Sequence, residues 1–333
     1  MLAKGDREVK ILAVLGTRPQ IIKHSVLAPV LAARHDLVTV DTGQHYSKAL
    51  ADDLYRELGL ARPLTTLLVT DLDRMLDGLT QEMLLAKPDL VLVYGDTRST
   101  LAGALAAAEL AIPIAHVEAG LRSFDKAMPE ERYRVTVDHL SRWLLAPTLS
   151  AVINLANETL RSGVTLVGDL MEDLVATTLP TLEPLRSDPY YFATIHRQEN
   201  RTPEAMAKWA AILGELGHVV LALHPGTAAA LHATEIDLGL NVEVIEPVGY
   251  RESLRLQLHA RAVLTDSGGV QREAQWLGTP CLVLREVSEW PYASTVGLDL
   301  GRVKAALARE RRVPPTAIFG NVAETIANAL ETA

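Results

Sequence analysis

The chain has 333 residues, of which 48% are hydrophobic and 22% charged, proportions typical of a folded globular protein and not of a disordered one. The 32 basic and 41 acidic side chains give a formal net charge of −9, which argues against nucleic-acid and membrane partners because both require a basic surface. The single cysteine, Cys281, excludes an intramolecular disulfide and a multi-cysteine metal site. No apolar run approaches the roughly 18 residues of a membrane span, so we expect a cytoplasmic protein.

Short apolar runs alternate with longer helical stretches in the first half of the chain. Residues 9–15 predict a buried strand, and residues 18–33 predict a helix because their apolar side chains recur at helical spacing. Further strands are predicted at 38–41, 90–94, 112–117 and 143–146. Nearly continuous apolar strands that alternate with helices indicate a parallel sheet covered on both faces.

The same pattern restarts after residues 176–189, whose three prolines and lack of a sustained period predict a linker. The later strands are predicted at 191–195, 219–223, 242–245, 262–264 and 281–284. We therefore predict an α/β protein of two Rossmann-like domains with a cleft between them. The first spans 1–175 and the second 190–320, and a C-terminal helix at 321–333 has the first domain as a candidate partner.

Ligands of open parallel sheets bind beyond the carboxyl ends of the strands, so the residues that follow each strand are the informative ones. Arg18 and Lys23 follow the first strand and place two cations at a helix start suited to a diphosphate. Asp96 follows a later strand and is either a helix N-cap or a carboxylate that faces the cleft. Glu118 ends another buried strand, where a charge is costly unless it is paired or solvated.

A third acid, Glu130, comes directly after Pro129 at a predicted helix start. That position also suits the helix dipole, which would explain Glu130 without any chemistry. The recurrence of acids beyond one sheet nevertheless favours a group that includes a general acid and a general base.

The second half of the chain carries the features of an anion site. His196 ends its first strand and is the histidine that we select for proton transfer or phosphate contact, and His224 is a weaker candidate of the same kind. A later strand runs into Ser267, Gly268 and Gly269 at a helix start, where free backbone amides and a hydroxyl form a phosphate cradle. Glu273, about one turn on, is placed to accept hydrogen bonds from ribose hydroxyls.

Taken together, these stretches resemble the non-hydrolysing UDP-N-acetylglucosamine 2-epimerase family. The matching motifs follow the family's order over most of the chain: GTRPQIIK (16–23), TGQHY (42–46), YGDTRSTLAGALAA (94–107), HVEAGLRS (116–123), PEERYR (129–134), TIHRQENR (194–201), EPVGY (246–250) and TDSGGVQREA (265–274). One such motif would be weak evidence for the family, but eight motifs in the family's order are specific to it.

The resemblance implies a fold like that of the B-type glycosyltransferases (GT-B), with no cofactor and no metal, and suggests a homodimer. It implies inversion at C2 of UDP-N-acetylglucosamine through anti elimination of UDP, a 2-acetamidoglucal intermediate and re-addition. Asp96, Glu118, Glu130 and His196 would then be catalytic. The residues implied to bind the UDP-sugar substrate are Arg18, Lys23, Arg134, His224, Ser267, Gly268, Gly269 and Glu273.

The chain departs from the family pattern at Gln20, where relatives usually carry Glu, at Arg272, which replaces a glutamate, and at Ser253, where many relatives carry an aromatic that packs on uracil. Three other activities remain open at this point. They are a 2-epimerase of a UDP-2,3-diacetamido sugar, a hydrolysing 2-epimerase, and a GT-B glycosyltransferase.

Overall fold

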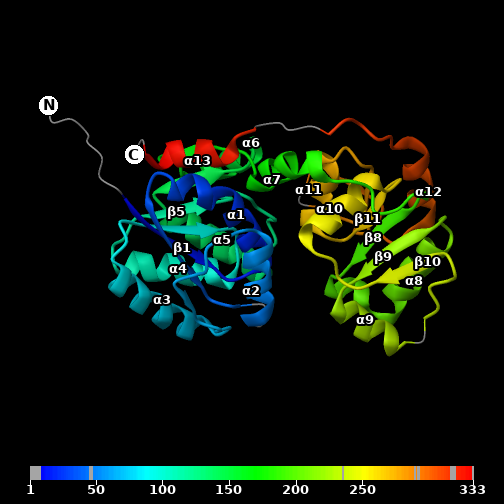
Figure 1. Ribbon diagram of the computed structural model, residues 1–333, viewed down its shortest axis with the longest axis horizontal. Helices are drawn as coiled ribbons and strands as arrows, with labels where there is room; N and C mark the ends of the chain where they lie inside the picture. Colours follow the sequence, from blue (N-terminus) through cyan, green and yellow to red (C-terminus); the bar gives the residue numbers. More distant parts are fainter. Residues whose placement is uncertain are drawn as a thin grey trace. The chain divides into compact units, whose positions relative to one another are not determined.

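Two separate parallel sheets organise the chain, as the computed structural model in Figure 1 shows for residues 9–44, 48–234, 236–288, 290, 293–315 and 320–331. Residues 1–174 and 319–333 cluster into one compact unit, here unit 1, and residues 175–318 into a second, unit 2. The division falls inside a helix, at Leu174. Among the described helices, none is both long and apolar enough to cross a membrane.

Unit 1 contains, within its described part, a seven-stranded sheet in the order β3-β2-β1-β4-β5-β6-β7, in which every paired neighbour runs parallel. Its central strands are almost wholly buried because helices cover both faces. The strands are β1 (Lys10–Leu15), β2 (Asp36–Asp41), β3 (Thr65–Thr66), β4 (Leu90–Tyr94), β5 (Ile114–Val117), β6 (Trp143–Ala146) and β7 (Val164–Leu166). The helices are α1 (Arg18–Ala32), α2 (Lys48–Glu57), α3 (Leu72–Ala86), α4 (Arg98–Glu109), α5 (Pro129–Leu140), α6 (Leu149–Asn157) and α13 (Val322–Glu331), together with the first half of α7 (Leu170–Thr178).

Unit 2 repeats this plan with six described strands in the order β10-β9-β8-β11-β12-β13, again parallel. The largest fully buried side chains of its core are Trp209, Tyr190 and Phe192. The strands are β8 (Tyr191–Ile195), β9 (Val219–Leu223), β10 (Val242–Ile245), β11 (Val263–Thr265), β12 (Cys281–Val283) and β13 (Ser294–Thr295). The helices are α8 (Pro203–Gly214), α9 (Pro225–His232), α10 (Tyr250–His259), α11 (Gly268–Trp276) and α12 (Leu300–Arg309), with 3-10 turns at Leu179–Thr181 and Gln198–Arg201.

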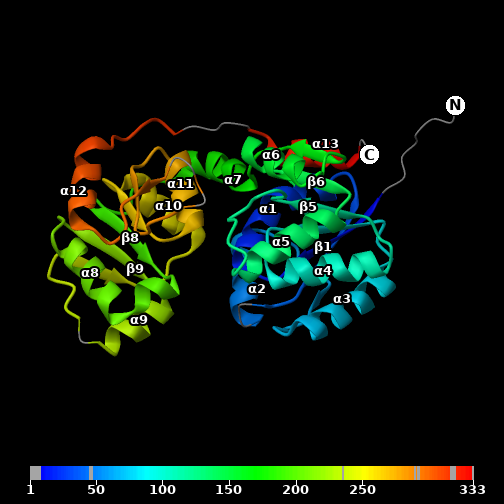
Figure 2. The same cartoon turned by 180° about the vertical axis from the view of Figure 1, so that it is seen from behind.

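The C-terminal helix α13 belongs to unit 1, where it lies against α1 (Figures 1 and 2). Its apolar face is buried, with Ile326 fully inaccessible to solvent. The Asp173 carboxylate accepts a hydrogen bond from the Ala323 amide at 2.9 Å and so satisfies a free N–H group of the first turn. Arg34, two residues beyond the end of α1, forms ion pairs with two glutamates of α13. The last helix thus completes the unit that contains the first strand.

Candidate functional site

The carboxyl ends of parallel strands meet at one edge of a sheet, and each unit gathers its polar groups at that edge. In unit 1, Glu118 follows β5 with a left-handed φ of 70°. Its amide donates to the Leu145 carbonyl at 3.1 Å, and its carboxylate pairs with Lys23 of α1. Gly95, after β4, has a φ of 64°, and a Cβ there would lie 3.2 Å from Glu118 Oε2. The chain therefore requires glycine beside this carboxylate.

Asp96 is not the cap of the helix that follows it. Thr97 is the N-cap of α4, and its hydroxyl accepts from the Thr100 amide at 3.3 Å. The Asp96 side chain instead forms an ion pair with Arg134 of α5 and remains about one-third exposed. Of the two interpretations that the sequence allowed for Asp96, the structure excludes the helix N-cap, and a carboxylate that faces the cleft stays a prediction.

The two glutamates at the start of α5 differ in their surroundings. Glu131 is buried and accepts hydrogen bonds from the Ser123 and Phe124 amides at 2.8 and 3.0 Å, which fixes the preceding loop. Glu130 is exposed, and within the described part of the chain its carboxylate makes no hydrogen bond or ion pair. Because it precedes Arg134 by four residues, the two share one face of α5. The Glu130 carboxylate is thus accessible to a ligand.

Gln20 joins the loop after β1 to the loop after β4. This buried amide accepts from the Thr17 N–H at 3.1 Å and donates to the Tyr94 carbonyl at 2.8 Å and to Thr97 Oγ1 at 2.9 Å. Arg18, by contrast, is exposed at the first residue of α1. The sequence marked Gln20 only as a departure from the family, and its position one turn into the helix was the available signal of a role.

In unit 2, His196 follows β8 and is held by Asp266, which the sequence did not single out. The fully buried Asp266 carboxylate accepts from the His196 and Arg197 amides at 3.1 and 3.0 Å and from Asn200 Nδ2 at 2.8 Å. His196 Nδ1 lies 3.4 Å from Asp266 Oδ1. Burial lowers the pKa of His196, and the nearby arginines lower that pKa further against the opposing effect of Asp266. An acid directly after β11 was the sequence signal for Asp266.

The second predicted histidine lies beside the first. The rings of His196 and His224 have centroids 6.0 Å apart. His224 caps α9, where its Nδ1 accepts from the Gly226 amide at 3.1 Å, so the proton of the neutral ring is on Nε2. Burial lowers the pKa of His224, and the charge of Arg201 lowers it as well. Both histidines therefore favour the neutral ring.

The start of α11 has the geometry of an anion site. Ser267 is its N-cap, and Ser267 Oγ accepts from the Val270 amide at 3.4 Å. A Cβ on Gly269 would meet only Ser267 Oγ, at 3.9 Å, so the protein's own packing does not require glycine there. Close approach of a ligand to the backbone would require it. Glu273 is buried one turn on, and Gln257 Nε2 donates to its Oε2 at 2.6 Å.

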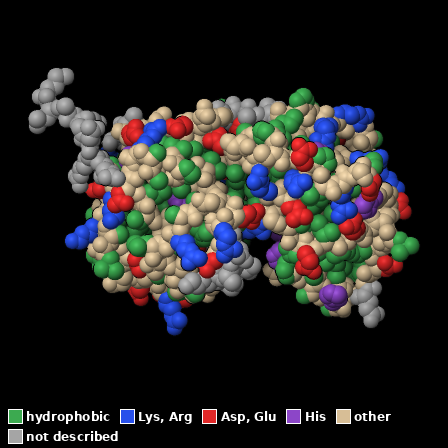
Figure 3. All heavy atoms as spheres, in the orientation of Figure 1, with side chains coloured by type: hydrophobic (Ala, Val, Ile, Leu, Met, Phe, Trp, Pro, Cys, Tyr) green, Lys and Arg blue, Asp and Glu red, His purple; other side chains and the backbone are tan. Residues whose placement is uncertain are grey.

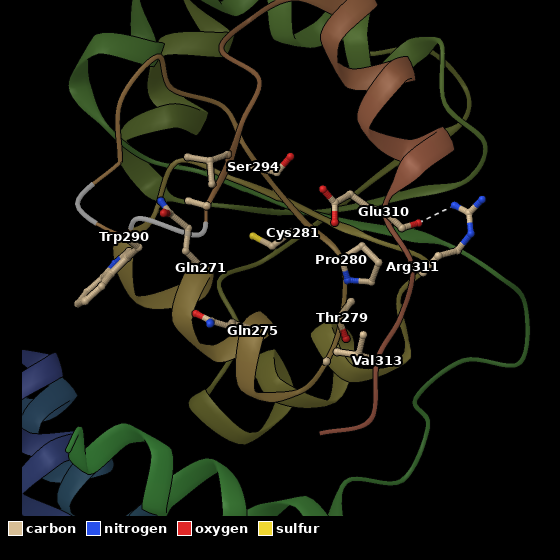
Figure 4. Close-up of a pocket in the computed structure, with 13 residues that line it drawn as sticks. Gln271, Gln275, Thr279, Pro280, Cys281, Trp290, Ser294, Glu310, Arg311 and Val313 are labelled. Carbon is tan, nitrogen blue, oxygen red and sulfur yellow. Dashed lines mark hydrogen bonds between the residues drawn. The ribbon is translucent and has the colours of Figure 1, made fainter. Parts of the chain in front are cut away.

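A separate cavity of about 210 Å³ runs along α11 toward the amino end of β12. Figure 4 shows Gln271, Gln275 and the Cys281 thiol at its wall, and none of the three cradle residues lines it. Burial raises the pKa of Cys281 to about 12, so this thiol stays protonated and is a poor nucleophile. Among the described residues, no group of three His, Cys, Asp or Glu side chains is arranged to hold a metal ion.

Charges of both signs are interspersed on the face drawn in Figure 3, as the modest net charge suggests. Of the predicted site residues, the structure brings Lys23 to Glu118 and Arg134 to Asp96, and it places the two histidines together. His45 and Tyr46 of the TGQHY motif lie outside the described residues.

The family described as UDP-N-acetylglucosamine 2-epimerase matches residues 31–306 of the chain. The chain belongs to the UDP-N-acetylglucosamine 2-epimerase family. Membership in this 2-epimerase family confirms the resemblance that the eight motifs predicted. The assignment of individual catalytic and binding residues stays a prediction.

Three relatives of this epimerase are informative. A UDP-N-acetylglucosamine 2-epimerase homolog of Methanococcus maripaludis is 37% identical, over 95% of this chain and 94% of its own. The UDP-2,3-diacetamido-2,3-dideoxy-D-glucuronate 2-epimerase of Pseudomonas aeruginosa is 39% identical over 88% of each chain. The crystal structure of Methanocaldococcus jannaschii UDP-GlcNAc 2-epimerase with UDP-GlcNAc and UDP matches with a TM-score of 0.87 and 34% identity, over 97% of this chain and 100% of that one. This match and the two parallel sheets confirm the predicted α/β fold of two Rossmann-like domains.

Proposed function

We propose that this protein reversibly inverts C2 of UDP-N-acetylglucosamine to give UDP-N-acetylmannosamine. The observation that carries the proposal is the set of acids at the carboxyl edge of the unit 1 sheet, two of them held by cations, in a chain of the 2-epimerase family. A simple binding protein has no use for three such carboxylates. A glycosyltransferase typically needs only one base.

The proposed reaction explains why the acids are paired with cations. A base removes the C2 proton, the C–H electrons form the C1=C2 double bond, and the C1–O bond breaks as UDP leaves. Re-addition of UDP and protonation at the opposite face of C2 complete the inversion. Asp96, Glu118 and Glu130 together supply the base and the acid, and Lys23 and Arg134 hold two of them in place.

UDP must leave C1 and yet stay bound, so its negative charge has to be stabilised without full release. The cradle of Ser267, Gly268 and Gly269 offers backbone amides at the start of α11 to the diphosphate, with Arg18 as a further cation. His196 and His224, both favouring the neutral ring, can donate a hydrogen bond to phosphate or move a proton.

Glu273 is placed to accept from the ribose hydroxyls, since Gln257 fixes its carboxylate through Nε2. Gln257 Nε2 also donates to Ser253 Oγ at 3.1 Å within α10, which holds the amide that contacts Glu273. A cavity of about 540 Å³ adjoins this helix at the end of β10, lined in part by Pro247 and Glu252. We place the nucleobase there.

A second candidate substrate is a UDP-2,3-diacetamido sugar, favoured by the Pseudomonas aeruginosa relative, which is 39% identical. The sugar named for that relative differs from UDP-N-acetylglucosamine at C3 and, as a glucuronate, at C6, and the two reactions share the C2 inversion. The same residues would therefore serve both reactions.

The test is proton NMR of UDP-N-acetylglucosamine incubated with the protein in heavy water. Deuterium at C2 with a manno product supports the proposal, whereas free sugar would show a hydrolysing enzyme. If this sugar is unchanged and the diacetamido sugar gains deuterium, the second candidate is correct. If neither sugar exchanges, the epimerase proposal is wrong and a transferase or a binding role remains.

Variants connect that reaction to the acids. Asp96→Asn, Glu118→Gln and Glu130→Gln should each abolish C2 exchange and leave UDP binding, measured by calorimetry, largely intact. Glu109→Gln is the matched control, because this exposed carboxylate ends α4 at the opposite end from Thr97. Full exchange in all three site variants would contradict the mechanism.

We also propose a homodimer, as the family suggests. Leu149 and Ile153, one turn apart on α6, are 63% and 52% exposed and offer an apolar surface in unit 1. Light scattering coupled to size exclusion should give twice the 36.2 kDa chain mass. A mass of one chain would contradict the proposal.

A further inference from the structure

His116 lies in β5, two residues before Glu118, and neither it nor its partner Asp138 has a part in the reaction described above. Both side chains are fully buried. His116 Nδ1 lies 2.7 Å from Asp138 Oδ1, and His116 Nε2 lies 2.7 Å from the Gly95 carbonyl oxygen. Each ring nitrogen therefore has a close partner, one from α5 and one from the loop after β4.

Both of these partners only accept hydrogen bonds, because one is a carboxylate and the other a backbone carbonyl. A neutral imidazole carries one N–H, so one of the two contacts would bring a ring lone pair against an oxygen at 2.7 Å. Exchanging the tautomer only moves this repulsion to the other contact. The doubly protonated imidazolium satisfies both contacts.

The surroundings are balanced for such a buried cation. Burial by itself raises the pKa of Asp138, whereas the positive charges of a protonated His116 and of Arg122 outweigh burial and hold that pKa below its ordinary value. Arg122 Nη1 lies 2.8 Å from Asp138 Oδ2, and Arg122 also pairs with Glu158 at 2.6 Å. With His116 protonated, two cations face two carboxylates, which is the condition for burying charge at tolerable cost.

The hydrogen bond from His116 fixes the peptide between the two strand ends. The Gly95 amide donates to the Val117 carbonyl at 2.9 Å, so both backbone groups of Gly95 are bound to β5. Asp96 is the next residue, and Gly95 leaves room for the Glu118 carboxylate. A hydrogen bond from a cation is stronger than one from a neutral ring and holds this geometry more firmly.

We propose that Asp138 holds His116 as a buried imidazolium and that its charged hydrogen bond to the Gly95 carbonyl positions Asp96 and Glu118. The positioning role rests on the proposed epimerase function, whereas the charge of His116 does not. His116 touches no reacting atom in this account, so it is a positioning residue and not a catalytic one.

Nitrogen-15 NMR of the ring nitrogens, with ¹⁵N-histidine in the resting protein at pH 7.5, tests the charge directly. His116→Gln identifies the His116 signals among those of the ten histidines. We expect both His116 nitrogens to carry protons. A ring with one protonated nitrogen would overturn the proposal.

His24 is the matched control in the same spectrum. It is equally buried, but its ring nitrogens lie 2.8 Å from the Tyr94 hydroxyl and 3.1 Å from Thr39 Oγ1, and a hydroxyl can donate as well as accept. Burial lowers the pKa of His24 to about 4. His24 should therefore be neutral where His116 is charged.

Asp138→Asn tests the positioning role, because it keeps the shape of the side chain and removes the charge that holds the imidazolium. We expect His116 to lose a ring proton, the Asp96 and Glu118 amide resonances to move, and kcat to fall about 100-fold, as for a small misplacement of reacting groups, while KM changes less than about twofold. Unchanged amide resonances and an unchanged kcat would refute the positioning role.

Two safeguards keep the outcomes distinct. If Asp138→Asn does not fold, the nitrogen-15 spectrum of the wild-type protein still decides the charge of His116. The kinetic and amide measurements are then made on His116→Gln, which retains a hydrogen-bond donor for the Gly95 carbonyl, in place of Asp138→Asn. If the wild-type protein exchanges deuterium into neither sugar, the proposed function fails. The ring protonation and the amide shifts still judge the His116 proposal independently.

Discussion

Asp266 offers the sharpest test of how unit 2 holds His196. Three donors converge on its fully buried carboxylate, the amides of His196 and Arg197 and the side-chain amide of Asn200. Asp266→Ala leaves all three without an acceptor. At about 1–3 kcal/mol for each buried unsatisfied group, and with some relief from entering water, we expect a loss of about 3–5 kcal/mol in the free energy of unfolding.

Asp266→Asn separates geometry from charge. Asp266 Oδ2 alone lies within 3.2 Å of all three donors, so one remaining oxygen can serve them. We therefore expect Asn to cost only about 1–2 kcal/mol, mainly the loss of charge-assisted bonding. Both variants remove the carboxylate that opposes the lowering of the His196 pKa, so this pKa should fall further in both.

Thermal unfolding measures the loss of stability, which we expect to lower Tm by about 8–15 °C for Asp266→Ala and about 3–6 °C for Asp266→Asn. Proton NMR titration of His196 measures the expected fall of its pKa. Asp299→Asn is the control, because Asp299 caps α12 by accepting from the Arg302 amide at 2.8 Å and Asn caps equally well. An Ala variant within 3 °C of wild type, or an unchanged His196 titration, would refute the reasoning.

Four further predictions concern other parts of the chain. Gly95→Ala should lose about 1 kcal/mol of stability and most of kcat in steady-state assays, because its φ is left-handed and its Cβ would lie 3.2 Å from Glu118 Oε2. The folded-state pKa of His24, about 4, lies below its ordinary 6.5, so its stabilising effect is complete above pH 6.5 and is lost as the pH falls toward 4. Urea unfolding should show a loss of roughly 3 kcal/mol over that range, absent in His24→Gln. Cys281 should resist iodoacetamide at pH 8 until the protein unfolds, as followed by mass spectrometry. Ile326→Ala should lower the free energy of unfolding of unit 1 by about 2–5 kcal/mol in denaturant titration, since the side chain is fully buried.

Five of the predicted strands have the same bounds as strands of the structure. The ranges 90–94, 143–146, 191–195, 219–223 and 242–245 coincide with β4, β6, β8, β9 and β10. The missed strands β3, β7 and β13 have two or three residues and lie at sheet edges. Such short edge strands carry too few apolar residues for a pattern, and neighbouring strands define them instead.

The acids and cations of the candidate site were visible because each follows a strand, and parallel strands end at one edge. What the sequence left undecided was each side chain's partner. The sequence allowed Asp96 to be an N-cap or a carboxylate that faces the cleft, whereas the structure shows that Thr97 is the cap and that Asp96 pairs with Arg134. Pairing across 38 residues of sequence depends on which loops the sheet order brings together, and no local pattern encodes it.

The sequence by itself determined the family, the two-domain α/β architecture and the positions where chemistry is concentrated, because motif order and apolar periodicity are local properties of the chain. Only the tertiary structure decided that Asp266 holds His196, that Gln20 joins two loops, and that His116 faces two acceptors. These are contacts between residues far apart in sequence. They exist only after the strands are ordered in the sheet, and a buried polar group then takes whichever partner the fold provides.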